Sequence, residues 1–130
     1  MAEIERLGSG APWESVAGYS RVVRVGERVL VAGTTATMDD GAIAGIGDAG
    51  AQARQALANV VAALARVGAT PADVVRTRMY VTDISRWEEV ARAHGEVFGD
   101  APPVTAMVQV AALIDPRMLV EIEAEAVVSG

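Results

Sequence analysis

The stretch PVTAMVQVAALIDPRMLVEI, residues 103–122, decides the fold of this chain. Thr105 to Leu113 is an apolar run of strand length, and Met118 to Val128 continues as a second strand in which glutamates alternate with apolar residues. Asp115-Pro116 lies between the two runs and is typical of a loop. The C-terminal part of the chain is therefore predicted to be two strands of a β-sheet.

Upstream of this stretch, the apolar residues change to helical spacing in two places. The first run starts after Asp48 and stops at Gly68, with its inward face at Ala53, Ala56, Leu57, Val60, Leu64 and Val67. The second starts at Ser85, whose spacing to Glu88 is that of a capping box, and ends at Gly99. Its predicted inward face is Trp87, Val90, Ala91, His94, Val97 and Phe98.

The remaining regular segments are predicted to be strands. Residues 19–25 and 28–32 form a hairpin around Gly26-Glu27, residues 42–46 a short edge strand, and residues 74–82 an alternating strand. The chain up to Ala17 is predicted to be irregular. The predicted order is β-β-β-α-β-α-β-β, an α+β (α/β) sheet with two helices on one face, in a single domain spanning residues 1–130.

Two of the strands are apolar on both faces, at residues 29–32 and 108–112. Two helices can cover only one face of such a sheet, and strands with this pattern are usually buried on both faces. The open face is therefore expected to pack against other copies of the chain, which predicts a homo-oligomer.

Composition excludes several kinds of chemistry. The chain has no cysteine, and His94 is its only histidine, so no cluster of zinc or iron ligands is expected. All eleven basic residues are arginine, which excludes a lysine Schiff base. A net charge of −6 with few aromatic residues argues against nucleic-acid binding. No apolar run is long enough for a membrane span and no signal peptide is recognised, so we expect a cytoplasmic location.

Among the titratable residues, Glu121 is the best candidate for acid–base chemistry. It shares one strand face with Glu123 and Glu125, and a carboxyl covered by a neighbouring subunit acquires a raised pKa. The alternative is a charged face paired with Arg76 and Arg78 across the sheet.

Residues 103–122 resemble the signature of the YjgF/RidA family of imine deaminases. That signature begins Pro-x-Arg, runs through an apolar strand and a loop, and ends Leu/Ile/Val-Glu-Ile, as Val120-Glu121-Ile122 does here. The resemblance covers almost the whole chain. Residues 17–20 are similar to the family's Gly-Pro-Tyr-Ser stretch, residues 31–33 to its Val-Ser-Gly strand, and residues 52–64 to its first helix.

The resemblance implies a chorismate-mutase-like fold, assembled as a homotrimeric barrel with ligand clefts between neighbouring subunits. Active members grip a substrate carboxylate with the arginine of the signature, and a glutamate and a water hydrolyse the imine to a keto acid and ammonia without metal or organic cofactor. For this chain it implies catalytic roles for Glu121 and Tyr19. The substrate-binding positions implied in the same way are Ala32, Gly33, Thr34, Thr105, Met107 and Arg117.

The chain departs from the family pattern at the arginine, which is Thr105 here, and at a serine near the cleft, which is Ala32. A hydroxyl supplies one donor where a guanidinium supplies a charged fork, a loss of about 2–5 kcal/mol at a closed site. The chain therefore resembles the subgroups that lack the arginine. Arg78 and Arg117 are the candidates for replacing it, with surface ion pairs as the alternative for both.

Two hypotheses follow for the function. The first is an enzyme that uses Glu121 and water to hydrolyse or tautomerise a small imine, enamine or carbonyl compound, with reduced dependence on an α-carboxylate. The second is a non-catalytic trimer that binds or senses a metabolite in the same clefts. A ribonuclease activity, attached to some members of the family, is disfavoured by the acidic charge and by the lone His94.

Overall fold

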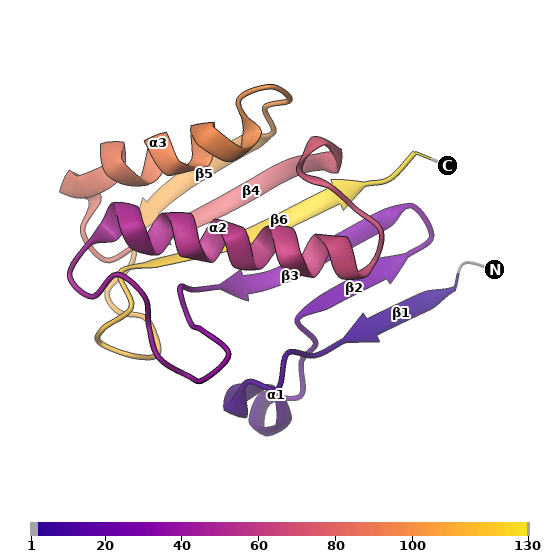
Figure 1. Cartoon of the computed structure of the whole chain (residues 1–130), viewed down its shortest axis with the longest axis horizontal. Coiled ribbons are helices and arrows are strands. Elements are labelled where there is room, and N and C mark those ends of the chain that lie inside the picture. Colours follow the sequence, from indigo (N-terminus) through magenta and orange to yellow (C-terminus); the bar gives the residue numbers. More distant parts are fainter. Residues whose placement is uncertain (1–2, 130) are drawn as a thin grey trace.

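The computed structural model describes residues 3–129, whose six strands form one sheet in the order β1-β2-β3-β6-β4-β5 (Figure 1). Strand β5 runs parallel to β4, and every other neighbouring pair is antiparallel. The strands are β1 (Ile4–Leu7), β2 (Val22–Val25), β3 (Arg28–Thr34), β4 (Val74–Val81), β5 (Val104–Gln109) and β6 (Val120–Val127).

Two long helices, α2 (Ala49–Arg66) and α3 (Trp87–Phe98), lie side by side on one face of this sheet (Figure 1). A short helix, α1 (Pro12–Ala17), and the turns η1 (Pro71–Asp73) and η2 (Ile84–Arg86) complete the elements. The predicted α+β sheet with both long helices on one face is confirmed. Within residues 3–129, no helix is long and apolar enough to span a membrane.

The core lies between the helices and the sheet, as the helical spacing predicts. Leu57, Val60 and Leu64 of α2 are fully buried, and they belong to one apolar cluster with Val120 and Ile122 of β6. The helix begins where the Asp48 carboxylate accepts a hydrogen bond from the Ala51 N–H, 3.0 Å away. Apolar burial on this scale holds β6 in place between β3 and β4.

The short edge strand predicted at residues 42–46 is not a strand of this sheet. Residues 42–46 form only an isolated bridge from Ile43 to Thr37, because Gly41 and Gly45 adopt positive φ values of 86° and 70° that interrupt an extended run. The missing strand is β1, in the segment predicted to be irregular. It pairs with β2 from Ile4 to Leu7, and its exposed side chains give little hydrophobic pattern. The same segment also contains α1, which begins at Pro12.

The predicted start of the second helix is also wrong. Ser85 lies in η2, and its N–H and hydroxyl both donate to Asp83 Oδ1, at 3.0 and 2.6 Å. The helix α3 starts at Trp87, whose side chain is exposed rather than inward. The other predicted inward residues range from buried to half-buried.

Strands β4 and β5 differ from their predicted patterns. A bulge in β4 leaves both Val75 and Arg76 exposed, so that Val74 is buried on the same side as Thr77. Strand β5 ends at Gln109 rather than at Leu113, and the chain then turns into the long loop before β6.

The sheet face opposite the helices exposes large apolar side chains. Leu30 of β3 is 40% exposed, and Val104 and Val108 of β5 are 62% and 48% exposed. In each strand their neighbours face the helices, so these three side chains share the open face. Such a surface is typical of a face that packs against another protein copy.

Candidate functional site

Glu121 lies where the pairing of β3 with β6 becomes irregular. Val31 pairs with Ala124 and Thr34 with Ile122, so β3 carries one more residue than β6 over this interval. Gly33 lies in that bulge, and a Cβ atom at Gly33 would stand 2.7 Å from Oε2 of Glu121. The absent side chain of Gly33 therefore makes room for the Glu121 carboxylate, and these two candidate site residues lie together within one chain.

The surroundings of Glu121 raise its pKa above 4.5, mainly because the carboxyl is partly buried and also because Glu123 is negatively charged. The positive charge of Arg21 acts in the opposite direction. A carboxyl group shifted in this way exchanges a proton more readily near neutral pH than an exposed glutamate does. The pKa of the acid–base candidate is thus shifted in the direction that favours such chemistry.

Tyr19 is positioned by α1, the helix that was not predicted. Gly18 ends α1 in the left-handed conformation with φ 73°, and the N–H groups of Gly18 and Tyr19 both donate to the Glu14 carbonyl. The Tyr19 side chain is 37% exposed, and the Arg21 guanidinium lies 5.8 Å from the centre of its ring. Helix α1 therefore places an accessible phenol close to a cation.

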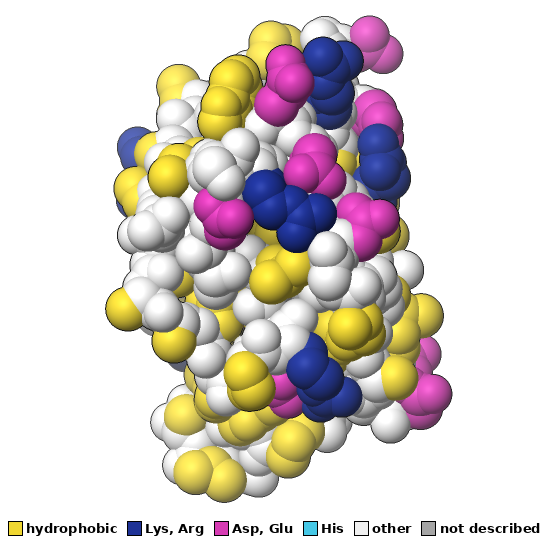
Figure 2. Space-filling model, turned by 90° about the vertical axis from the view of Figure 1, so that its left-hand side faces the viewer, with side chains coloured by type: hydrophobic (Ala, Val, Ile, Leu, Met, Phe, Trp, Pro, Cys, Tyr) yellow, Lys and Arg dark blue, Asp and Glu magenta, His cyan; other side chains and the backbone are white. Residues whose placement is uncertain are grey.

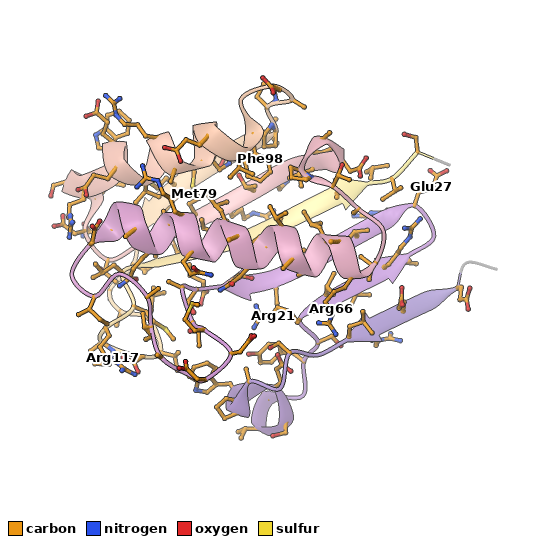
Figure 3. All side chains as sticks on the ribbon, viewed as in Figure 1. Arg21, Glu27, Arg66, Met79, Phe98 and Arg117 are labelled. Carbon is orange, nitrogen blue, oxygen red and sulfur yellow. The ribbon has the colours of Figure 1, made fainter. Side chains whose placement is uncertain are left out.

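Arg21 was not identified from the sequence, although it connects several of the predicted positions. Its Nη1 donates to the Gly33 carbonyl at 2.6 Å and to Thr34 Oγ1 at 3.0 Å. The Thr34 hydroxyl in turn donates to the Ala32 carbonyl at 2.7 Å. In Figure 3 the Arg21 side chain extends toward the end of β3. The spacing of Arg21 two residues after Tyr19 in extended chain was the signal available, because such residues share a face.

Gln52 was also missed as a residue of the site's framework. This fully buried side chain donates to the carbonyls of Gly45 and Arg117, at 3.3 and 2.8 Å, and accepts from the Leu119 N–H at 2.8 Å. It thereby ties α2 to the segment that leads into β6. The available signal was a polar residue beside the apolar positions of the first helical run.

Thr105 and Met107 face the helices, on the side of the sheet opposite Glu121. Strand β5 pairs Thr105 with Thr77 and Met107 with Met79, and both partners are buried under the helices. Glu121 instead lies between Val120 and Ile122, which point to the helix side. One chain therefore does not bring Thr105 or Met107 together with Glu121, and a shared cleft requires a second copy.

The Thr105 hydroxyl ends a chain of hydrogen bonds that starts at a buried histidine. Thr77 Oγ1 lies 2.7 Å from His94 Nε2 and donates to Thr105 Oγ1 over 2.7 Å. A hydroxyl has one proton to donate, so Thr77 accepts from His94, which puts the ring proton on Nε2. Burial lowers the pKa of His94 below 6.5 and favours this neutral form. The Thr105 proton stays available to a ligand.

Within residues 3–129, neither arginine considered as a substitute forms an ion pair with Glu121. Arg117 forms a fork with Asp115 in its own loop, at 3.0 and 2.8 Å, and holds the pKa of that carboxyl down to about 2. Arg78 pairs with Glu125 at 3.3 Å. The surface-ion-pair alternative describes both residues in this chain. Within residues 3–129, no group of three or more His, Cys, Asp and Glu side chains is arranged to hold a metal ion.

A hollow of about 270 Å³ lies on the open sheet face, and Glu121 is not part of its lining. Leu30 and Ala32 of β3 line it together with Arg76, Arg78, Glu123 and Glu125. Tyr80 also donates a hydrogen bond to Glu123 on this face, and the bond and the negative charge raise the pKa of Tyr80. The predicted pairing across the sheet is present at Glu125, which pairs with Arg76 at 4.0 Å and with Arg78 at 3.3 Å.

Comparison with known proteins identifies the family. A family model described as Endoribonuclease L-PSP matches residues 9–128. The chain belongs to this family. It is the YjgF/RidA family that residues 103–122 resemble, so that prediction is confirmed.

Solved structures of the family share the whole architecture. Rv2704 of Mycobacterium tuberculosis, a member of the YjgF/YER057c/UK114 family, is 53% identical, with a TM-score of 0.89 over 97% of this chain and 100% of that one. TdcF of E. coli, solved with bound serine, is 27% identical with a TM-score of 0.80 over 95% and 94%. The chorismate-mutase-like fold is thereby confirmed. The uncharacterized protein SCO2049 of Streptomyces coelicolor is 41% identical over 95% of this chain and 91% of its own length.

Proposed function

We propose that this YjgF/RidA protein binds a small imine, enamine or carbonyl compound beside Glu121 and hydrolyses it with a water molecule. The observation that carries the proposal is the partly buried Glu121 carboxyl, which lies over Gly33 and has a raised pKa. In this role Glu121 accepts a proton from the attacking water and returns it to the departing nitrogen. Tyr19, accessible from solvent, orients the substrate.

The clefts are proposed to lie between subunits of a homotrimer. The exposed apolar side chains of Leu30, Val104 and Val108 support a second copy on the open face. A second copy would also provide the approach of Thr105 and Met107 to Glu121 that one chain lacks. The bound serine in TdcF supports a ligand of small-metabolite size.

Ordinary 2-imino acids are proposed to be poorer substrates for this protein than for family members that carry the arginine. Thr105 occupies the position of the family's carboxylate-binding arginine, and its hydroxyl accepts a hydrogen bond from Thr77. It therefore offers a single neutral donor to a ligand. Where no substrate is turned over, the same clefts would serve a binding or sensing trimer, and the replacement of the arginine by Thr105 is the observation that favours this second candidate.

A ribonuclease activity, which the family model's description names, is not proposed. The net charge is −6, and Figure 2 shows acidic and basic side chains alternating on one face of the molecule rather than gathering into a basic patch. Attraction to a phosphate backbone would be weak for such a surface.

Ammonia release from freshly generated 2-iminobutyrate tests the proposal. We expect wild-type turnover well below that of a family member that carries the arginine, and a gain of about tenfold or more with Thr105→Arg. The matched control is Thr70→Arg, since Thr70 caps η1 away from the sheet. Wild-type turnover equal to that of the arginine-bearing relative would contradict the role assigned to Thr105.

A panel of imines and enamines with and without a carboxylate then separates the two candidates. The enzyme hypothesis predicts turnover that Glu121→Ala abolishes. The binding hypothesis predicts affinity that Glu121→Ala leaves largely unchanged and no turnover with any member of the panel.

A further inference from the structure

In the described part of the chain, the guanidinium of Arg21 makes its hydrogen bonds to the protein through Nη1 alone. Its Nη1 is anchored on the bulge of β3, on the Gly33 carbonyl at 2.6 Å and on Thr34 Oγ1 at 3.0 Å, with the Ala32 carbonyl at 3.5 Å. Within residues 3–129, its Nε and Nη2 donate no hydrogen bond to protein. Every fully buried side-chain nitrogen or oxygen in that range has a partner, so this other edge of Arg21 keeps contact with solvent.

The Nε–Nη2 edge is the one with which Arg54, Arg86 and Arg117 hold a carboxylate through two hydrogen bonds. Arg54 uses it on Glu96, at 3.1 and 3.0 Å. Arg86 makes the same division as Arg21, since its Nη1 donates to the Gly47 carbonyl while its Nε and Nη2 hold Glu89 at 3.0 and 3.3 Å. Two parallel N–H donors match the two oxygens of a carboxylate.

The acid nearest to this edge of Arg21 does not occupy it. Glu14 Oε2 lies 3.9 Å from Arg21 Nε, beyond hydrogen-bond distance. The Glu14 oxygens already accept from the N–H groups of Ser9 and Gly10 and from the Ser9 hydroxyl. Arg21 therefore has a neutralising charge nearby but no bidentate partner.

The free edge belongs to the proposed site. Arg21 lies 5.8 Å from the Tyr19 ring, and its anchor Gly33 is the residue that the Glu121 carboxylate contacts. The effect of Arg21 on the Glu121 pKa places the two charges within electrostatic range. This arginine is neither of the two considered from the sequence as substitutes for the one absent at Thr105.

We propose that Arg21 supplies the cation of the Glu121 site and binds a ligand carboxylate through its Nε–Nη2 edge. This inference rests on the proposed function and adds the recognition group to it. The ligand is a small organic acid whose carboxylate points toward Tyr19 and α1. Its carbonyl or imine carbon then lies toward Glu121. The carboxylate would thus be held from a different side than the one Thr105 occupies.

Direct binding of 2-oxobutyrate, compared with its neutral amide 2-oxobutyramide, tests this assignment. The wild type is expected to bind the acid at least about tenfold more tightly than the amide, because only the acid completes the charged fork. Arg21→Gln keeps an amide donor for the Gly33 carbonyl and should lose this preference. Arg24→Gln is the matched control, since Arg24 spends its donors on the Gly26 and Val67 carbonyls, and it should keep the preference.

The arginine Nε–H resonances give a second readout that does not depend on a folded variant. The chain has eleven arginines, a number small enough for each Nε–H signal to be assigned to its residue. Saturation with 2-oxobutyrate should shift the Arg21 signal and leave that of Arg24 in place. An unshifted Arg21 signal, or an equal affinity for acid and amide in the wild type, would overturn the assignment.

A Glu121 variant tests the proposed function independently of the Arg21 site. Glu121→Gln removes the acid–base group and a nearby negative charge, so it should bind 2-oxobutyrate as well as or better than the wild type. Preserved selectivity in a protein that turns over no imine would leave the Arg21 site standing and refute the hydrolase. Turnover of an imine without any preference for the acid over the amide would refute the Arg21 site and leave the hydrolase standing.

Discussion

Gly33 and Glu121 approach each other so closely that a single methyl group on Gly33 would stand 2.7 Å from Glu121 Oε2 and 2.8 Å from its Cδ. The backbone angles at position 33 do not require a glycine, since the φ of Gly33 is not positive. A glycine is required there because the Glu121 carboxylate occupies the space above the strand. The two residues come from neighbouring strands, and the bulge of β3 brings them together.

Gly33→Ala is therefore expected to displace the Glu121 carboxylate at small cost in stability. The clashing atoms belong to the end of a flexible side chain, so the change in unfolding free energy should stay within about 1–2 kcal/mol, while the turnover that depends on Glu121 falls sharply. Gly95→Ala is the control, because nothing lies near its added Cβ, and it should stabilise α3 by about 0.5–1 kcal/mol. Denaturant unfolding and a turnover assay measure the two effects; unchanged turnover in Gly33→Ala would show that the contact does not matter.

The raised pKa of Glu121 predicts a pH dependence of stability with a definite sign. The folded protein retains the Glu121 proton in a range where the unfolded chain has lost it, so this contribution is full below pH 4.5 and is lost as pH rises through the folded-state pKa. Glu121→Gln should therefore gain stability relative to wild type as pH rises above 4.5. Urea unfolding at several pH values measures the difference.

Glu96→Gln is the contrasting control for that series. The hydrogen bond from Arg54 lowers the pKa of Glu96, so its contribution is present above pH 4.5 and is lost on acidification. This variant should lose stability relative to wild type as pH rises. The same sign in both variants would contradict the environment assigned to Glu121.

His94 should make the protein less stable in mild acid. Burial lowers its pKa below 6.5, so the unfolded chain takes up a proton that the folded chain refuses, and stability falls as pH drops below 6.5. His94→Gln lacks this component, so the stability difference between variant and wild type should change as pH drops below 6.5. Nitrogen chemical shifts of the ring should also show the proton on Nε2, as the direction of the hydrogen bond from Thr77 to Thr105 requires.

Gln52 is expected to make a large contribution to the free energy of unfolding, although it is a polar residue. Gln52→Met would leave the Leu119 N–H and the Arg117 carbonyl without their partner, at about 1–3 kcal/mol for each buried group. Gln55→Met, on the same helix with a single hydrogen bond to Asn59, should cost clearly less. Equal losses of unfolding free energy in the two variants would argue against the clamp.

The proposed trimer predicts a sedimentation mass three times the 13.5 kDa of one chain. Leu30→Glu places a charge on the open face and should reduce the mass toward that of a monomer. Val16→Glu, at a highly exposed position of α1, should not. A stable wild-type monomer would remove the inter-subunit cleft.

The amino-acid sequence by itself determined the family, the two long helices and the strands on which Glu121, Thr105 and Gly33 lie. These features follow from local periodicity and from a motif of adjacent residues at 103–122, which a linear reading contains completely. Strand β1 and helix α1 escaped it, because β1 is exposed and held by backbone pairing, and because α1 is a short turn between glycines.

Only the tertiary structure decided which of these residues meet. The bulge in β3 sets Gly33 under Glu121, and the pairing of β5 with β4 turns Thr105 toward His94 on the opposite face. Arg21 joins the site only because α1 and the end of β3 converge on it. Side-chain direction in a sheet depends on register and bulges, which are fixed by contacts between segments far apart in the chain.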